Sequence, residues 1–322
     1  MIMMIIAFLL GLILCLLFGV PYIDFLRKKT IGQYIRDLAP ENHKQKEGTP
    51  TTGGVFIIIS SLIACIITLF MAQKATTEAW VVLITYMFYA LAGFQDDFLK
   101  IKGHENKGLS ARGKFLRQVL IAVLPVLYVM LTNDNATVIT LGKYSIDCVW
   151  FYPLIGIFAI TGASNAYNLT DGLDGLAAST GLFAFGATAI IAKLSGHTDL
   201  AIISMAVMGA LLGFLKYNKP KAQVFMGDTG SLAIGGLLGV LAIMGKFEIY
   251  LILLAGIFVI ETLSVILQVI SFKTTGKRIF KMSPIHHHFE LCGFNEKQIV
   301  TGFAIFSMLC GIAAVVLFKF LL

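Results

Sequence analysis

The chain has 322 residues, of which 57% are hydrophobic and only 13% are charged, against roughly 25% charged residues in soluble proteins. This composition excludes a water-soluble globular protein. The net charge is +7, but no basic region is interleaved with aromatic residues in a soluble domain. We therefore expect no nucleic-acid partner, and we infer that the positive charge faces anionic lipid or an anionic substrate.

Ten apolar runs have about the length of 20 residues that an α-helix needs to cross a bilayer. They cover approximately 2–22, 53–72, 79–95, 116–132, 148–164, 177–193, 200–216, 229–245, 250–271 and 299–320. The runs are continuous rather than alternating, which excludes a transmembrane β-barrel. We predict an all-α, polytopic membrane protein with about ten transmembrane helices and a single domain over residues 1–322.

The connections between these runs differ in charge. Five alternate connections lie at approximately 23–52, 96–117, 165–176, 216–228 and 272–298. They hold 20 of the 25 Lys and Arg residues, and the other side of the membrane holds five. Because positive loops stay inside, we place the crowded connections in the cytoplasm and both termini outside. The external connections are too short for a domain, so we expect the active site in the cytoplasmic loops.

Five carboxylates share one depth, at the cytoplasmic ends of the predicted spans: Asp96, Asp97, Asp171, Asp174 and Asp228. One interpretation is ordinary interfacial charge, since helix ends are where charges cost least. Their sequence neighbours favour phosphate and metal chemistry instead.

The first of these neighbourhoods, Lys46 to Gly54, leads into the second run with a Gly-Thr-Pro-Thr-Thr-Gly-Gly segment. Such a segment can offer successive N–H groups and hydroxyls to an anion. Helix capping by Thr51 or Thr52 is the alternative.

The third run ends in a Phe-Gln-Asp-Asp-Phe-Leu-Lys sequence that contains Asp96, Asp97 and Lys100, followed by a basic rim that reaches Lys114. Adjacent helical residues point about 100° apart. We therefore expect different roles for the two acids, one binding metal or orienting a phosphate and the other acting as a base.

The connection after the fifth run carries no Lys or Arg. Asp171 and Asp174 are three residues apart, so a helical turn would place both on one face, and Gly172 lets a ligand approach closely. This pair suits a hard cation or the hydroxyls of a nucleoside or sugar, with Asn168 adding an amide. An ordinary Asx-rich turn is the alternative.

Asp228 lies in a Gly-Asp-Thr-Gly-Ser turn that opens the eighth run. We predict it as a Mg²⁺ ligand, because the free N–H groups of the helix N-terminus favour a phosphate beside the metal. Phe225 could stack on a base, although a membrane-surface anchor is the commoner role of such a residue.

Three consecutive histidines, His286, His287 and His288, lie in the last cytoplasmic connection. In a regular helix or strand they cannot all point at one atom. We expect one or two to face the site as donors to phosphate oxygens and the rest to hold the loop. A zinc site lacks convergent ligand spacing.

Together these motifs resemble the polyprenyl-phosphate N-acetylhexosamine-1-phosphate transferase family, and within it the enzymes that act on UDP-MurNAc-pentapeptide. The matching stretches are Gly48–Thr51, Asp96–Lys100, Asn168–Leu176, Phe225–Ser231 and His286–His288 with the following Phe-Glu. The resemblance implies ten transmembrane helices in a bacterial plasma membrane, with the active site facing the cytoplasm. It also implies Mg²⁺, a homodimer, and transfer of phospho-MurNAc-pentapeptide to undecaprenyl phosphate, giving lipid I and UMP.

The resemblance also implies roles by motif position. Metal binding falls to Asp228. The catalytic residues would be Asp96, Asp97, Lys100, Asp228, His286, His287 and His288. The substrate-binding residues would be Lys46, Thr51, Asn168, Asp171, Gly172, Leu173, Asp174, Asn218 and Phe225. Thr52 departs from the family pattern, which usually has Met there, and this concerns packing rather than the assignment.

The acceptor of such a reaction is a phosphate monoester whose second pKa is about 6, so it is already ionised and a general base is not required. Two alternatives stay open from the sequence. One is a related transferase that moves GlcNAc-1-phosphate to the same lipid. The other is a secondary transporter, although the acids lie at helix ends and no inverted repeat is seen.

Overall fold

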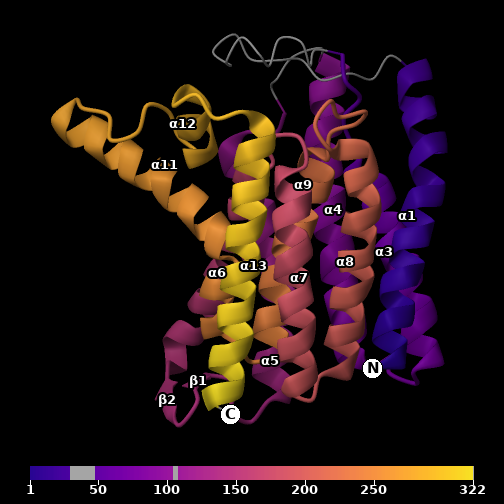
Figure 1. Cartoon of the computed structure of the whole chain (residues 1–322). Helices are drawn as coiled ribbons and strands as arrows, with labels where there is room; N and C mark the ends of the chain where they lie inside the picture. The colour runs from indigo at the N-terminus through magenta and orange to yellow at the C-terminus, as the bar shows by residue number, and fades with distance from the viewer. Residues whose placement is uncertain (30–47, 104–107, 322) are drawn as a thin grey trace.

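The computed structural model describes residues 1–29, 48–103 and 108–321, and Lys46 lies outside them. Ten helices in this part of the chain are long and apolar enough to cross a membrane, and they form an upright bundle (Figure 1). They are α1 (Ile2–Lys28), α3 (Gly54–Met71), α4 (Thr77–Gly103), α5 (Ala111–Thr132), α6 (Tyr152–Thr170), α7 (Leu176–Leu194), α8 (Thr198–Asn218), α9 (Gly227–Met244), α11 (Gly256–Thr275) and α13 (Glu296–Leu321). The prediction of a mainly helical protein with ten spans is confirmed.

The remaining elements are short. They are β1 (Val138–Leu141), β2 (Tyr144–Asp147), η1 (Val149–Phe151), η2 (Glu248–Tyr250), α10 (Leu251–Leu254) and α12 (Ile285–Leu291). The strands pair antiparallel, with Leu141 opposite Tyr144, around a turn that begins with a glycine at positive φ, as two-residue hairpin turns require. This hairpin was not predicted, because its strands are too short to stand out from a loop.

Helix α9 is the centre of the bundle. Of the window of α9 that could span the membrane, 94% is buried, and the helix packs between α4 and α6. Its many glycine, alanine and serine residues allow neighbouring backbones to come close, as is typical of packed transmembrane helices. Gly93 of α4 lies so near that an added Cβ would be 2.1 Å from the carbonyl oxygen of Asp228. The close approach fixes α4 against the first turn of α9.

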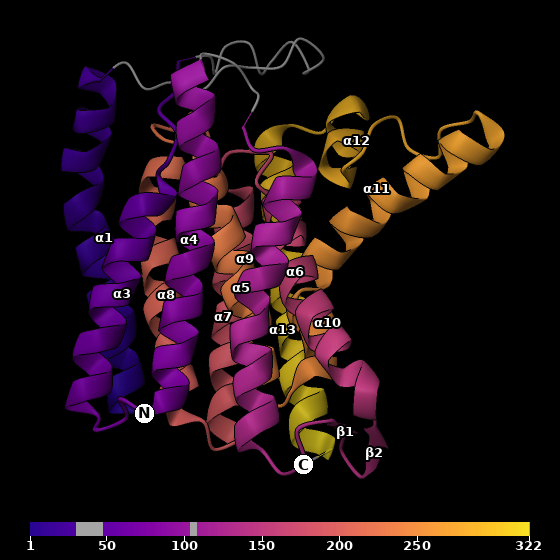
Figure 2. The same ribbon diagram turned by 180° about the vertical axis from the view of Figure 1, so that it is seen from behind.

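Two span boundaries differ from the sequence prediction. Helix α4 continues to Gly103, so Asp96 and Asp97 lie inside its last two turns rather than after its end. The ninth run is broken at Ala255 and Gly256 into α10 and α11, at a glycine that weakens helix continuity. From this break α11 tilts away from the bundle (Figure 2).

Both termini lie at the same end of the bundle (Figure 1), as an even number of spans requires. The other end is where α4 finishes and α9 begins. Which end faces the cytoplasm stays a prediction from the distribution of Lys and Arg.

A buried polar network ties the terminal end together. Glu248 accepts hydrogen bonds at Oε1 from the hydroxyl of Tyr152 at 2.6 Å and pairs with Lys246 at 2.9 Å. Lys246 also donates to the carbonyl of Ala136 beside the hairpin. The carboxylate therefore holds α6, α9 and the hairpin to one another.

Gly93→Ala should destabilise the protein, because the new Cβ would overlap the backbone of α9 and overpacking costs about 1–3 kcal/mol. We expect a lower midpoint of thermal unfolding for the purified protein in detergent. Gly103→Ala on the same helix, where an added Cβ meets nothing within 4 Å, is the matched control. Equal midpoints for the two variants would contradict the packing described for α4 and α9.

Candidate active site

Asp97 of α4 caps the N-terminus of α9. Its carboxylate accepts hydrogen bonds from the backbone N–H of Asp228 at 3.0 Å and of Thr229 at 2.9 Å. The hydroxyl of Thr229 donates a third bond at 2.6 Å. The first N–H groups of a helix have no partner within it and carry partial positive charge, so a carboxylate from another helix satisfies them well. The cap holds Asp228 in place.

Asp228 in turn is surrounded by donors from three other helices. Its Oδ2 lies 2.9 Å from Nζ of Lys100 and 2.7 Å from Nζ of Lys114. Its Oδ1 accepts a hydrogen bond from the side-chain amide of Asn168 at 2.8 Å. Lys100 also pairs with Asp96 at 2.6 Å, so the two carboxylates share one cation.

Asp96 and Asp97 have different partners, as their adjacent helical positions led us to expect. Asp97 faces the backbone of α9, whereas Asp96 pairs with Lys100 and accepts a hydrogen bond from the N–H of Leu109 at 2.7 Å. One acid therefore organises a helix start, and the other lies beside a basic side chain.

The donor set of this cluster fits a hard divalent cation. Asp96, Asp97 and Asp228 are all buried, and each offers an oxygen such that the three atoms lie within 4.8 Å of one another. An all-oxygen carboxylate set is what Mg²⁺ prefers over softer metals. Two lysines face three carboxylates here, so a cation would relieve the remaining negative charge.

Asp171 adds a fourth carboxyl nearby. Burial, together with the negative charges of Asp228 and Asp97, raises the pKa of Asp171 well above its usual range, and a backbone hydrogen bond from Gly227 opposes the shift. The shift reports the same crowding of acidic groups at the start of α9.

Residues 171–175 form a turn between α6 and α7, so the prediction that Asp171 and Asp174 share a helical face is wrong. Helix α6 ends at Thr170, and Gly175 adopts a left-handed conformation before α7. Asp171 is directed at the acid cluster, whereas Asp174 accepts a hydrogen bond from the N–H of Ala222 at 3.0 Å. Glycine at a positive φ redirects the chain there at no steric cost.

Three further predicted substrate residues have structural partners. The side chain of Asn218 accepts from the N–H of Gly175 and donates to the carbonyl of Val224, so it joins two turns. Leu173 is buried in the hydrophobic core. Phe225 is half-buried, and its N–H donates to the carbonyl of Pro50.

The loop before α3 reaches the same place. The N–H of Gly53 donates to the carbonyl of Phe225 at 2.8 Å, which brings Thr51 beside the start of α9. Thr51 is itself buried. The segment from Pro50 to Gly54 therefore borders the site.

The three histidines take three directions. His286 is buried, and its Nδ1 lies 3.0 Å from Oε1 of Glu261. His287 contacts Glu290 at 2.6 Å. His288 accepts a hydrogen bond from the N–H of Lys281 and so holds the loop. Of the three, His286 is the one packed against the turn at Gly172.

Sequence reasoning placed Lys114 only in a basic rim, and it did not single out Glu261. The signal for Glu261 was available, because a lone carboxylate within an apolar run is costly and marks function more often than chance. Lys114 had no comparable signal, since its neighbours are also basic.

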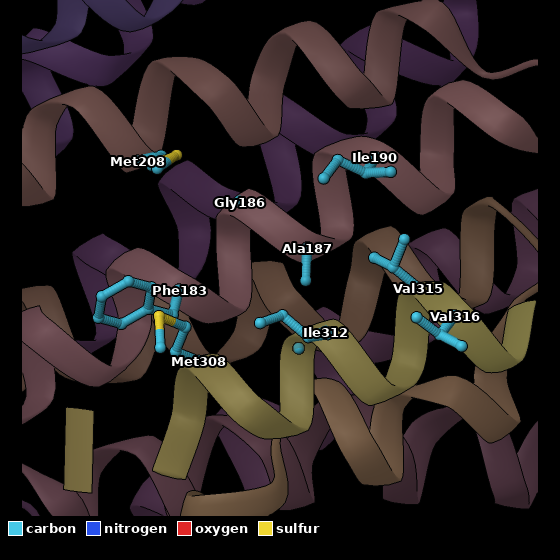
Figure 3. Close-up of a pocket in the computed structure, with 10 residues that line it drawn as sticks. Phe183, Gly186, Ala187, Ile190, Met208, Met308, Ile312, Val315 and Val316 are labelled. Carbon is cyan, nitrogen blue, oxygen red and sulfur yellow. The ribbon is translucent and has the colours of Figure 1, made fainter. Parts of the chain in front are cut away.

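An apolar pocket and a second group of potential metal ligands lie outside the acid cluster. An apolar pocket of about 240 Å³ lies between α7, α8 and α13 and is lined only by apolar residues such as Phe183 and Met308 (Figure 3). A second group of potential metal ligands, Glu78, His197 and Asp199, lies at the terminal end of the bundle. A hydrogen bond and ion pair to Glu78 raise the pKa of His197.

Comparison with known proteins gives one consistent result. Residues 79–246 match glycosyl transferase family 4. A relative from Halalkalibacterium halodurans is 45% identical over 98% of this chain and 97% of its own length. Relatives from Oceanobacillus iheyensis and Bacillus subtilis are each 48% identical, over 96% and 92% of this chain and 94% and 91% of their own lengths. All three are named phospho-N-acetylmuramoyl-pentapeptide-transferase. With ten spans and a buried acid cluster at one end of the bundle, the chain belongs to glycosyl transferase family 4 and, within it, to the phospho-N-acetylmuramoyl-pentapeptide-transferases.

Proposed function

We propose that the acid cluster between α4 and α9 is where this chain transfers phospho-MurNAc-pentapeptide from its UDP carrier to undecaprenyl phosphate. The products are lipid I and UMP. The observation that carries this proposal is the convergence of Asp96, Asp97 and Asp228 with two lysines, in a chain similar over nearly its whole length to transferases of that name.

The reaction is a phosphoryl transfer that needs no general base, because the acceptor phosphate is already ionised. An oxygen of the lipid phosphate attacks the sugar-bearing phosphorus of the UDP donor. The bond from that phosphorus to the bridging oxygen breaks, and UMP leaves with this oxygen. A new diphosphate then joins the sugar to the lipid. Catalysis of this kind asks a protein mainly for positioning and charge neutralisation.

The residues of the cluster supply both. Asp228, with Asp96 and Asp97 beside it, would hold Mg²⁺, which neutralises charge on the diphosphate when bound. The ammonium groups of Lys100 and Lys114 already lie within 3 Å of Asp228. They are placed to take up negative charge that develops on the leaving phosphate.

The nucleotide side is assigned to the turns that border the cluster. Asn168, Asp171 and Asp174 would hold the nucleoside and sugar, with Phe225 against the base. Thr51 would border the diphosphate, as would Lys46, which lies outside the described residues. In this assignment Asn218, Gly172 and Leu173 act by shaping the turns, since their contacts are to protein.

We place the site at the cytoplasmic face of a bacterial plasma membrane, because 20 of 25 Lys and Arg residues lie on that side in our topology. The lipid acceptor would reach it from the bilayer. The homodimer implied by the family resemblance stays a prediction, which cross-linking in native membranes would test.

Purified protein should release UMP from UDP-MurNAc-pentapeptide when undecaprenyl phosphate and Mg²⁺ are both present. Omitting the lipid or adding a chelator should abolish release, because the first removes the nucleophile and the second the charge neutralisation. UDP-GlcNAc in place of the donor separates the related GlcNAc-1-phosphate transferase. Equal or faster turnover of UDP-GlcNAc would sink the assignment of donor.

Asp228→Asn should lower turnover by about 10³-fold or more, since the variant keeps the size of the side chain and removes a charge at the reacting phosphates. Turnover of Asp228→Asn near that of the wild type would contradict the site.

Asp96→Asn tests whether Asp96 acts as a general base. We expect this variant to reduce turnover without changing the dependence of turnover on pH between 6.5 and 8.5. If a pH dependence that the wild type shows in that range is lost in Asp96→Asn, Asp96 would instead have the role of a base.

A further inference from the structure

Glu261 is a buried carboxylate that the reaction as described does not use. It lies in the second turn of α11 with no exposed surface. Within the described ranges no lysine or arginine forms an ion pair with it. A carboxylate inside a membrane-spanning helix is expensive unless it has a partner and a function. Among the described residues its side chain pairs with His286, with 3.0 Å between Oε1 and Nδ1.

The other ring nitrogen of His286, Nε2, is buried without a hydrogen-bond partner among the described residues. The residue is 1% exposed, and its Nε2 has no hydrogen-bond partner in the described part of the chain. It points at the turn after α6, where a Cβ added to Gly172 would lie 2.3 Å from this atom. A buried polar atom without a hydrogen-bond partner destabilises the fold, so its retention indicates a ligand that pairs with it.

The neighbourhood of Nε2 identifies the chemistry of that ligand. Gly172 directly follows Asp171, whose carboxyl accepts a backbone hydrogen bond from Gly227 at the start of α9. Nε2 therefore faces a turn that borders the acid cluster of Asp96, Asp97 and Asp228. A histidine whose Nδ1–H donates a hydrogen bond to a carboxylate has a fixed ring orientation and a defined role for its second nitrogen.

We propose that Glu261 is a positioning residue that fixes the ring of His286 through Nδ1 and presents Nε2–H to a phosphate oxygen of the bound substrate. In this arrangement Glu261 lies on one side of the ring and the phosphate on the other. The inference rests on the proposed function for the identity of the phosphate. It does not rest on it for the coupling of Glu261 to His286.

The chain offers a matched control in Glu248. This carboxylate is also buried and also has one oxygen without a partner among the described residues, but it lies at the terminal end of the bundle with Tyr152 and Lys246. Glu248→Gln removes a buried charge of the same kind far from the site. This control separates the effect of losing any buried carboxylate from the effect of losing Glu261.

Glu261→Gln should lower kcat/KM for UMP release by about 10–100-fold, as is usual when the group that orients a histidine is removed. Glu261→Asp, which keeps the charge, should recover part of this loss, and Glu248→Gln should leave the rate within about twofold. In a His286→Asn background, Glu261→Gln should cost no more than about twofold, because the residue through which it acts is gone. An equal loss in both backgrounds would overturn the proposal.

A spectroscopic readout keeps the inference separate from the reaction. In nanodiscs of ¹⁵N-histidine-labelled protein, the signals missing from His286→Asn identify His286 among the six histidines. Glu261→Gln should shift its Nδ1 signal, and Glu248→Gln should not. Unchanged His286 signals in both Glu261→Gln and Glu261→Asp would overturn the proposal even in an active enzyme. Absence of UMP release by the wild type would instead overturn the proposed function and leave this spectral test standing.

Discussion

The cap that Asp97 places on the N-terminus of α9 is the interaction on which the rest of the site depends. Three hydrogen bonds join a carboxylate of α4 to Asp228 and Thr229, and the cap works because a helix start has unpaired donors and a positive potential. The close approach of α4 and α9 at Gly93 brings the two helices within reach. Without the cap, the first N–H groups of α9 would lose their partner, and α4 would no longer fix the backbone that carries Asp228.

The same geometry sets the electrostatics. Because Asp97 satisfies the helix, Asp228 is left to face Lys100, Lys114 and Asn168. A cluster with three buried carboxylates and two lysines is charged negatively overall. Burial, and after it the charges of Asp228 and Asp97, raise the pKa of Asp171. A bound divalent cation would neutralise the carboxylates, and a bound anionic substrate would neutralise the two lysines.

The spans and the common depth of the acids could be predicted from the sequence, because a bilayer imposes a length on apolar runs and a cost on charges. The sequence does not show which group each carboxylate faces. Asp97 and Asp228 are 131 residues apart, and only the packing of two helices decides that one carboxylate caps the other's helix. A helical turn would have placed Asp171 and Asp174 on one face, but spacing alone does not show that α6 ends at Thr170.

The histidines illustrate the same limit. Three in a row predict that the side chains point in different directions, and their contacts do differ. Which one meets the turn at Gly172 depends on how α12 packs against the tilted α11 (Figures 1 and 2). Glu261 supplies the missing constraint from a helix whose sequence otherwise indicates only a membrane span. Residues that act through another residue carry no motif of their own.

Binding of Mn²⁺, followed by electron paramagnetic resonance on the purified protein without substrate, would establish whether Asp228 and its neighbours hold a divalent cation. We expect one bound Mn²⁺ per chain, displaced by Mg²⁺, and lost in Asp228→Asn while Glu248→Gln binds it like the wild type. Undiminished binding in Asp228→Asn, or no binding to the wild type at millimolar Mn²⁺, would contradict a cation site between α4 and α9.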